Sequence, residues 1–205
     1  MPQPMIRSAT PADMPQIVDT LTAAFMSDPI LGWMAREGAA RQSALRALFT
    51  LMVAEAKRDT LWIDIANDGA GVAVWIKPGY PSSATGLRAQ IALLPRFLAV
   101  SGLARIVRAL AVGQMMDRIH PHAPHAYLQF LACHPDHQGQ GLGSALLAHR
   151  LTQTDDLGLS AYLETGTERN VTLYLRHGFA VTGEDRPMKA GPNCWSMWRE
   201  LPERG

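Results

Sequence analysis

The sequence predicts a layered α/β fold in which helices cover a central sheet. One observation is the order of hydrophobic patterns: helices, a hairpin, more helices, and then a strand, a glycine-rich loop and alternating helices and strands. The other is composition, since 47% of the 205 residues are hydrophobic and 18% are charged, which is enough apolar material for a core. No linker-like stretch divides the chain. We therefore expect one domain over residues 1–205, with a helical insertion at about 82–120.

Two helices are expected before the first strand. Thr10 can cap a helix whose first position holds Pro11, and apolar residues then recur at helical spacing. Asp28 and Pro29 should end this helix, because proline cannot continue it. A second helix is expected over residues 41–57, where leucine, phenylalanine and methionine share one face.

A hairpin and a long apolar stretch should follow. Residues 60–66 and 71–77 are strand patterns, and the Asn-Asp-Gly sequence between them is typical of a turn. Residues 82–120 have helical periodicity, and their glycines and proline predict two or three short helices. This stretch is either a helical layer on the sheet or the wall of a substrate pocket.

The second half of the chain alternates between strand and helix patterns. A helix should run from Ser144 to about residue 155, and a shorter one over residues 170–177 should end at Gly178. The strand candidates are residues 126–133, 161–164, 179–183 and 194–201.

Charge and cysteine content exclude several classes of protein. Lys and Arg total 19 against 18 Asp and Glu, so no basic excess points to nucleic acid as a partner. Two cysteines, Cys133 and Cys194, are too few for a disulfide scaffold and fit a reducing cytoplasm. Arg96, Arg105 and Arg108 interrupt the most apolar region, and the first residues lack a signal-peptide pattern. We expect a cytoplasmic protein without integral membrane association.

A glycine-rich segment, residues 138–143, separates a predicted strand from the helix that begins at Ser144. Such a turn is typical of phosphate binding, because glycine lets backbone amides approach a ligand at the positive end of a helix. A nucleoside triphosphate loop would need a lysine after Gly143, and none is there. A dinucleotide loop would need a third glycine at Ser144 and more chain for its remaining βα units. A pyrophosphate held by backbone amides alone fits best.

The run from Leu131 to Gly143 resembles the acyl-CoA-binding motif of the GNAT superfamily of N-acetyltransferases. Gln138, Gly141 and Gly143 match its core, Gln/Arg-x-x-Gly-x-Gly/Ala, and residues 170–179 resemble the second motif of the family. Among branches, the chain is most similar to the one that includes puromycin N-acetyltransferase. The resemblance implies a GNAT-like fold with a mixed central sheet of about six to seven strands flanked by helices. It also implies transfer of an acetyl group from the cosubstrate acetyl-CoA directly to the amine of a small molecule or peptide.

The resemblance assigns roles to individual residues. The backbones of Leu131, Ala132 and Cys133 would pair with the pantetheine arm, and Asn170 would contact the cosubstrate from the next helix. The side chain of Tyr174, one turn later, would protonate the leaving thiolate. The pyrophosphate would be held by the backbone amides of Gln138, Gly139, Gln140, Gly141, Leu142, Gly143 and Ser144.

The acceptor side carries weaker assignments. Glu164 is the candidate base, because an amine is mostly protonated at neutral pH and must lose a proton before it attacks. Phe25 and Trp33 are candidates for the wall of the acceptor pocket. Structural roles stay open for both reactive groups: Tyr174 as a packed aromatic, and Glu164 as the partner of an arginine or amide. Cys133 is expected to be a small buried side chain rather than a nucleophile, since it lies in the strand that would pair with pantetheine.

The last expectations concern metal binding, a second possible function and the oligomeric state. Five histidines between positions 120 and 137 lack the spacing of a metal site, so we expect no metal. A second possible function is that of a non-catalytic acyl-CoA sensor or partner-binding protein on the same fold. The side chains of four arginines either favour an acidic acceptor or are solvated charges: Arg88, Arg96, Arg105 and Arg108. The 82–120 stretch or the C-terminal strands would each support a homodimer.

Overall fold

A seven-stranded mixed sheet organises the chain, which the computed structural model describes over residues 4–55, 59–79 and 87–202. The strand order is β1-β2-β3-β4-β5-β7-β6, and β4 and β5 are parallel while the other neighbours are antiparallel. The strands are β1 (Ile6–Ser8), β2 (Leu61–Ala66), β3 (Gly71–Ile76), β4 (His125–Cys133), β5 (Ser160–Thr165), β6 (Ala180–Asp185) and β7 (Cys194–Arg199). The predicted mixed sheet of about six to seven strands is confirmed.

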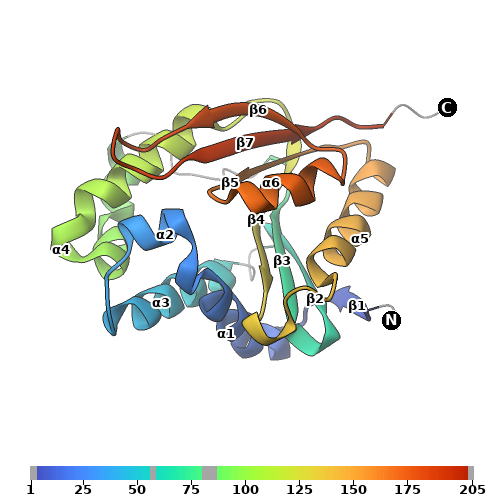
Figure 1. Cartoon of the computed structure of the whole chain (residues 1–205), viewed down its shortest axis with the longest axis horizontal. Coiled ribbons are helices and arrows are strands. Elements are labelled where there is room, and N and C mark those ends of the chain that lie inside the picture. The colour runs from blue at the N-terminus through green and yellow to red at the C-terminus, as the bar shows by residue number, and fades with distance from the viewer. Residues whose placement is uncertain (1–3, 56–58, 80–86, 203–205) are drawn as a thin grey trace.

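Helices cover both faces of this sheet and give two hydrophobic cores. Among the described residues they are α1 (Met14–Ala24), α2 (Pro29–Met34), α3 (Ala40–Glu55), α4 (Leu87–Ile119), α5 (Leu142–Asp156) and α6 (Glu168–Leu175). One core joins the sheet to α1–α4, with Phe49 and Met115 fully buried; the other joins it to α5 and α6 through Leu146 and Tyr174. In Figure 1, α2, α3 and α4 lie together on the left and α5 lies on the right.

The first helices begin and end close to the expected residues. A 3₁₀ turn over Pro11–Asp13 precedes α1, and the Asp13 carboxylate accepts a hydrogen bond of 2.7 Å from the Thr10 backbone amide. Asp28 also starts a new helix, because its carboxylate accepts a hydrogen bond from the Leu31 amide at the start of α2. The predicted helix over 41–57 is α3, whose expected last two residues lie outside the described residues.

Two elements differ from the expectations. Strand β1 was not predicted, because three residues are too few to show alternation; it pairs with β2 through Ile6 opposite Ala66. The 82–120 stretch contains α4, two helical segments joined at Gly102, while residues 82–86 lie outside the described residues. Gly102 has φ 64° and ψ 177°, a conformation that favours glycine, whereas Gly113 does not interrupt the helix.

Helix α4 forms a layer of the domain. By length and composition alone, Leu98–Ile119 would be long enough and apolar enough to cross a membrane. Its inner side chains, including Ala109 and Val112, nevertheless pack in the core, and α4 contacts α2 and α3. The described part of this stretch thus forms a helical layer, and its residues Val112 and Met116 also line a cavity, so both interpretations apply to it.

The two parallel strands pair over only four residues and then separate. Their register ends at Leu128 opposite Leu163, although β4 stays paired with β3 as far as Cys133. Residues 129–133 of β4 thus present a backbone edge that no described strand occupies. A free edge of this kind offers amides and carbonyls to an extended ligand.

A β-bulge marks the point of separation. Val74 of β3 faces Phe130 and Trp75 faces Leu128, so Gln129 has no partner in β3. A bulge changes the direction in which the backbone groups of a strand point, and bulges are frequent beside active sites. The irregularity therefore lies where β5 leaves β4.

Candidate active site

A cavity of about 890 Å³ lies where β4 and β5 separate. Its wall includes β4 from Tyr127 to Cys133 and the chain from Glu164 to Thr167. The glycine-rich loop and α6 contribute on one side, and α2, α4 and the turn before α2 contribute on the other. The cavity thus connects the free edge of β4 to residues of both helical layers.

The glycine-rich loop has the conformation expected of a phosphate-binding turn. Gly139 and Gly141 have φ values of 76° and 79°, and Gly141 is the N-cap of α5. No atom of another segment lies within 4 Å of a Cβ placed at either glycine. Glycine is therefore favoured at both positions by the positive φ and not by a lack of space for a side chain. The first amides of α5, beginning with Leu142, have no partner within their own helix, and the helix dipole favours an anion here.

A hydrogen bond connects the first turn of α5 to the turn that follows α6. The Ser144 hydroxyl and Nε2 of His177 are 2.8 Å apart. Burial, with the neighbouring cations Arg176 and Arg199, lowers the pKa of His177. The imidazole is therefore neutral at neutral pH and holds the start of α5 against the end of α6.

Tyr174 lies on α6 and lines the cavity. Its side chain is buried, and its ring packs edge-on against Phe179 with a centroid separation of 5.9 Å. Burial first, and then the charges of Asp28 and Cys133, raise the pKa of Tyr174 above its ordinary value. The phenol is therefore protonated at neutral pH and carries a proton into the cavity. Asn170, one turn earlier, lines the same cavity.

Glu164 is the first residue of β5 beyond its pairing with β4. Its side chain is only 4% exposed and lines the cavity. Within the described part of the chain, its Oε1 atom has no hydrogen-bond partner, while Nδ1 of His120 lies 3.7 Å away. A buried oxygen of this kind costs about 1–3 kcal/mol if it stays unsatisfied, so it is a candidate contact for a ligand.

Aromatic and aliphatic side chains form the wall of the cavity near α2. Phe25 packs against Phe49 and Phe130 at centroid distances of 5.6 and 5.4 Å, and Ile30 and Met116 also line the cavity. Ser27 and Asp28 also belong to this side of the wall. The aromatic and aliphatic part of the wall fits an apolar group of a ligand.

Most predicted site residues line this one cavity, but two do not. Trp33 is absent from the wall, and its indole ring lies 5.3 Å from the guanidinium of Arg108. Gln140 is exposed in the loop and is also absent from the wall. Sequence reasoning missed Tyr127 and Gln129, which lie in the predicted strand just before the matched motif. These two residues are found only once the separation of β4 from β5 is known, and no sequence pattern marks that separation.

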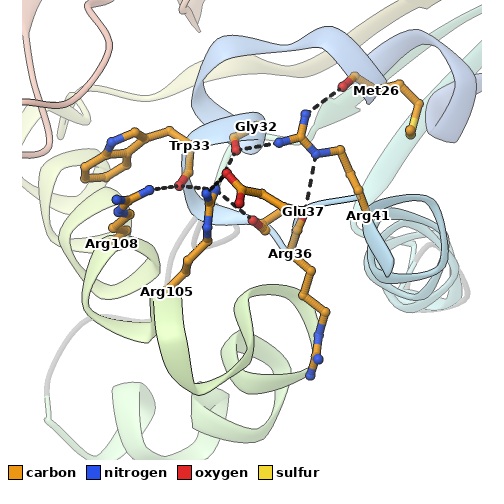
Figure 2. Close-up of polar contacts among 9 residues, drawn as sticks. Met26, Gly32, Trp33, Arg36, Glu37, Arg41, Arg105 and Arg108 are labelled. Carbon is orange, nitrogen blue, oxygen red and sulfur yellow. Dashed lines mark hydrogen bonds and ion pairs between the residues drawn. The ribbon is translucent and has the colours of Figure 1, made fainter. Parts of the chain in front are cut away.

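Arginines of α3 and α4 donate hydrogen bonds to backbone carbonyls of α2 and its C-cap. Figure 2 shows Arg105 pointing at the C-terminal carbonyls of α2, and its Nη1 donates to Gly32, Trp33 and Ala35 over 3.0–3.1 Å. Arg41 donates to the Gly32 carbonyl over 2.8 Å. Cations suit these carbonyls, which are the negative end of a helix. Of the two roles that the sequence suggested for Arg105, a solvated charge is wrong, because its side chain is paired and mostly buried. It is also absent from the cavity wall.

Among the residues that the structure describes, no three His, Cys, Asp or Glu side chains lie close enough together to hold a metal ion. The histidines form two separate pairs instead. His120 and His125 have ring centroids 4.9 Å apart, and His134 and His137 have centroids 6.1 Å apart.

Comparisons with known proteins define the class. A model of the acetyltransferase (GNAT) domain matches residues 97–181. The crystal structure of a histone acetyltransferase HPA2 and related acetyltransferase from Corynebacterium glutamicum is 30% identical, with a TM-score of 0.76 and 99% of each chain covered. The chain therefore belongs to the GNAT acetyltransferase superfamily.

More distant structures share the fold. Arylalkylamine N-acetyltransferase 2 from Aedes aegypti has a TM-score of 0.67 at 14% identity, covering 98% of this chain and 100% of that one. The polyamine N-acetyltransferase of Drosophila melanogaster, which forms N-acetylagmatine, has a TM-score of 0.64 at 13% identity, covering 97% and 100%. At these identities, the similarity of the two structures to this chain concerns the fold alone.

Proposed function

We propose that this protein transfers the acetyl group of acetyl-CoA directly to the amine of a small molecule or peptide. The observation that carries the proposal is the free edge of β4, which opens beside a glycine-rich turn at the start of α5. An extended amide-containing arm fits the first feature, and a diphosphate fits the second. Membership of the superfamily supports acetyl transfer in general.

The donor would be held mainly by backbone groups. We assign the pantetheine arm to the edge at Leu131, Ala132 and Cys133, all of which line the cavity. The pyrophosphate is assigned to the amides of residues 138–144. Asn170 is assigned a contact from α6. Acetyl-CoA supplies the activated acyl group, and the amide at the Gln129 bulge is a further candidate donor to the thioester carbonyl.

Glu164 and Tyr174 would manage the protons of the reaction. Glu164 accepts a proton from the acceptor ammonium, so that the free amine can attack the thioester carbon. A carbon–nitrogen bond forms and the carbon–sulfur bond breaks. Tyr174 donates its proton to the departing thiolate. The phenol is neutral at neutral pH and so carries this proton, but its raised pKa makes it a weak acid, so the transfer needs the prompt return of a proton from the amine nitrogen. The second proton of the amine nitrogen leaves after attack and restores the phenol.

The acceptor would be an amine with an apolar body. The wall with Phe25, Ile30 and Met116 supports this class, with the Glu164 carboxylate at the cavity surface. Two solved structures of the same fold are named as acetyltransferases of arylalkylamines and polyamines, which supports an amine and leaves its identity unspecified. The similarity to the puromycin N-acetyltransferase branch stays a prediction.

The test is release of free CoA thiol from acetyl-CoA in the presence of a panel of amines. The panel contains phenethylamine, putrescine, agmatine, glycinamide, an alanine-terminated peptide and puromycin. We expect thiol release that depends on at least one amine, with the N-acetylated product identified by mass. A protein that binds acetyl-CoA yet releases no thiol with any of these amines would instead support the sensor function.

A further inference from the structure

His120 lies immediately after α4 and faces the candidate base from outside the two GNAT-like motifs of the sequence. Its Nδ1 atom is 3.7 Å from Oε1 of Glu164. Its ring packs against His125 and Tyr127 at centroid distances of 4.9 Å, and against Tyr162 at 5.2 Å. The ring therefore has a defined position between the cavity and the end of α4.

The other titratable groups packed around Glu164 are poor proton acceptors. Burial raises the pKa of Tyr127 and Tyr162, with a further contribution from Glu164, so both phenols stay protonated. Burial also raises the pKa of the Cys194 thiol, to about 12. These three groups cannot take a proton from Glu164 at neutral pH.

His125 is also unsuitable. Its Nδ1 lies 2.6 Å from the backbone carbonyl of Ala123, which fixes a proton on that nitrogen, and burial lowers its pKa. His120 differs because its side chain is 19% exposed, whereas that of Glu164 is 4% exposed. An imidazole ring has two nitrogens, so it can accept a proton on one and release a proton from the other. His120 is thus the described side chain that both faces Glu164 and reaches solvent.

The reaction requires such a route. An acceptor ammonium loses two protons in becoming a secondary amide, and the thiolate of CoA takes only one. The other proton must reach solvent in every turnover, although Glu164 is almost completely buried. A base that cannot pass on its proton would stop after one cycle.

We propose that His120 is the positioning residue through which Glu164 releases this proton. Glu164 takes the proton from the ammonium nitrogen. The proton then crosses the 3.7 Å between Oε1 and Nδ1 of His120, through one bridging water or a small rotation of the ring. The exposed part of the imidazole then loses a proton to water, so no oxidant or further reactant is needed. The inference rests on the proposed function, because it requires an amine acceptor at Glu164.

The test uses the fastest amine of the acceptor panel. The variants are His120→Gln, His120→Ala, Glu164→Gln and the double variant of His120→Gln with Glu164→Gln. We expect His120→Gln to lower kcat at least 10-fold while both KM values stay within twofold. Because the two residues serve one route, the double variant should be no slower than Glu164→Gln alone. Added imidazole should restore part of the turnover of His120→Ala, a gain that a purely structural role would not give.

His122→Gln is the matched control, since His122 is an exposed histidine two residues away. It should retain wild-type kcat, and thermal melting should show that each variant is folded. Wild-type kcat in folded His120→Gln, multiplicative losses in the double variant, or no restoration by imidazole would each overturn the proposal. If the wild-type protein acetylates no amine, the proposed function fails first, which distinguishes the two failures.

Discussion

At the scale of single residues, Tyr174 and Glu164 come from different layers of the molecule but line one cavity. Tyr174 belongs to the core beneath α5 and α6. Leu163 points into that same core, so alternation along β5 directs Glu164 to the opposite face. A proton donor and a proton acceptor thus reach the gap between β4 and β5 from the two sides. This separation allows one group to serve the thiolate and the other the amine.

Replacing Tyr174 with phenylalanine tests the proton donor. The change keeps the ring that packs on Phe179 and removes only the hydroxyl. We expect kcat to fall at least 10-fold and the Kd of acetyl-CoA to change less than twofold, measured by steady-state kinetics and calorimetry. Phe179→Leu, which alters the packing and keeps the hydroxyl, is the control. Wild-type kcat under conditions where chemistry limits the rate would remove Tyr174 from the mechanism.

At the scale of elements, α2 is a six-residue helix whose position depends on arginines from α3 and α4. Such a short helix has little intrinsic stability. Arg105 reaches three of its carbonyls and also forms an ion pair with Glu37 (Figure 2). The apolar wall of the cavity near Ile30 is therefore held by side chains that do not line the cavity themselves.

Arg105→Met should loosen this wall without touching the donor side. We expect the KM of the acceptor to rise about three- to tenfold while the Kd of acetyl-CoA is unchanged, because α2 carries none of the groups assigned to the pyrophosphate. Arg118→Met is the control on the same helix, since Arg118 pairs with Asp185 at the surface. An equal effect of the two variants would show that α2 does not depend on Arg105.

A buried ion pair fixes α5 to the sheet. Arg150 of α5 donates from Nε to Oδ2 of Asp64 on β2 over 2.7 Å, and both side chains are buried. Arg150→Ala would leave the carboxylate without its partner, which costs about 3–5 kcal/mol in buried pairs. Urea unfolding should show a loss of this size, and Arg46→Ala, from an exposed pair, should show about 0–1 kcal/mol. Equal losses would contradict this role of the pair.

At the scale of the whole molecule, the sheet is continuous at one end of β4 and divided at the other. The pairing from His125 to Leu128 joins strands β1–β4 to strands β5–β7, and the cavity lies at the divided part. In Figure 1, β6 and β7 lie along one side, beyond β5. The fold therefore supplies a rigid frame and an opening within one sheet.

The sequence predicts the bounds of helices and strands better than the points at which neighbouring strands separate or bulge. The strand over 126–133 and the helix after the glycine loop have strong local patterns, so both were placed within two residues. The bulge at Gln129 and the separation of β5 depend on tertiary packing and have no local pattern. The contact between His120 and Glu164 joins residues 44 positions apart, so spacing alone could not reveal it.

The central claim is that backbone amides at the start of α5 bind the diphosphate of acetyl-CoA. Gly141 and Gly158 allow a matched comparison, because they flank the two ends of α5, have φ values of 79° and 71°, and have open space at Cβ. Both substitutions to glutamate add the same charge and similar backbone strain.

Calorimetric titration with acetyl-CoA of the wild-type protein, Gly141→Glu and Gly158→Glu is therefore the most direct measurement. We predict that Gly141→Glu weakens binding at least 100-fold and that Gly158→Glu binds within threefold of the wild type. Wild-type affinity in a folded Gly141→Glu variant, or equal losses in both variants, would contradict the claim.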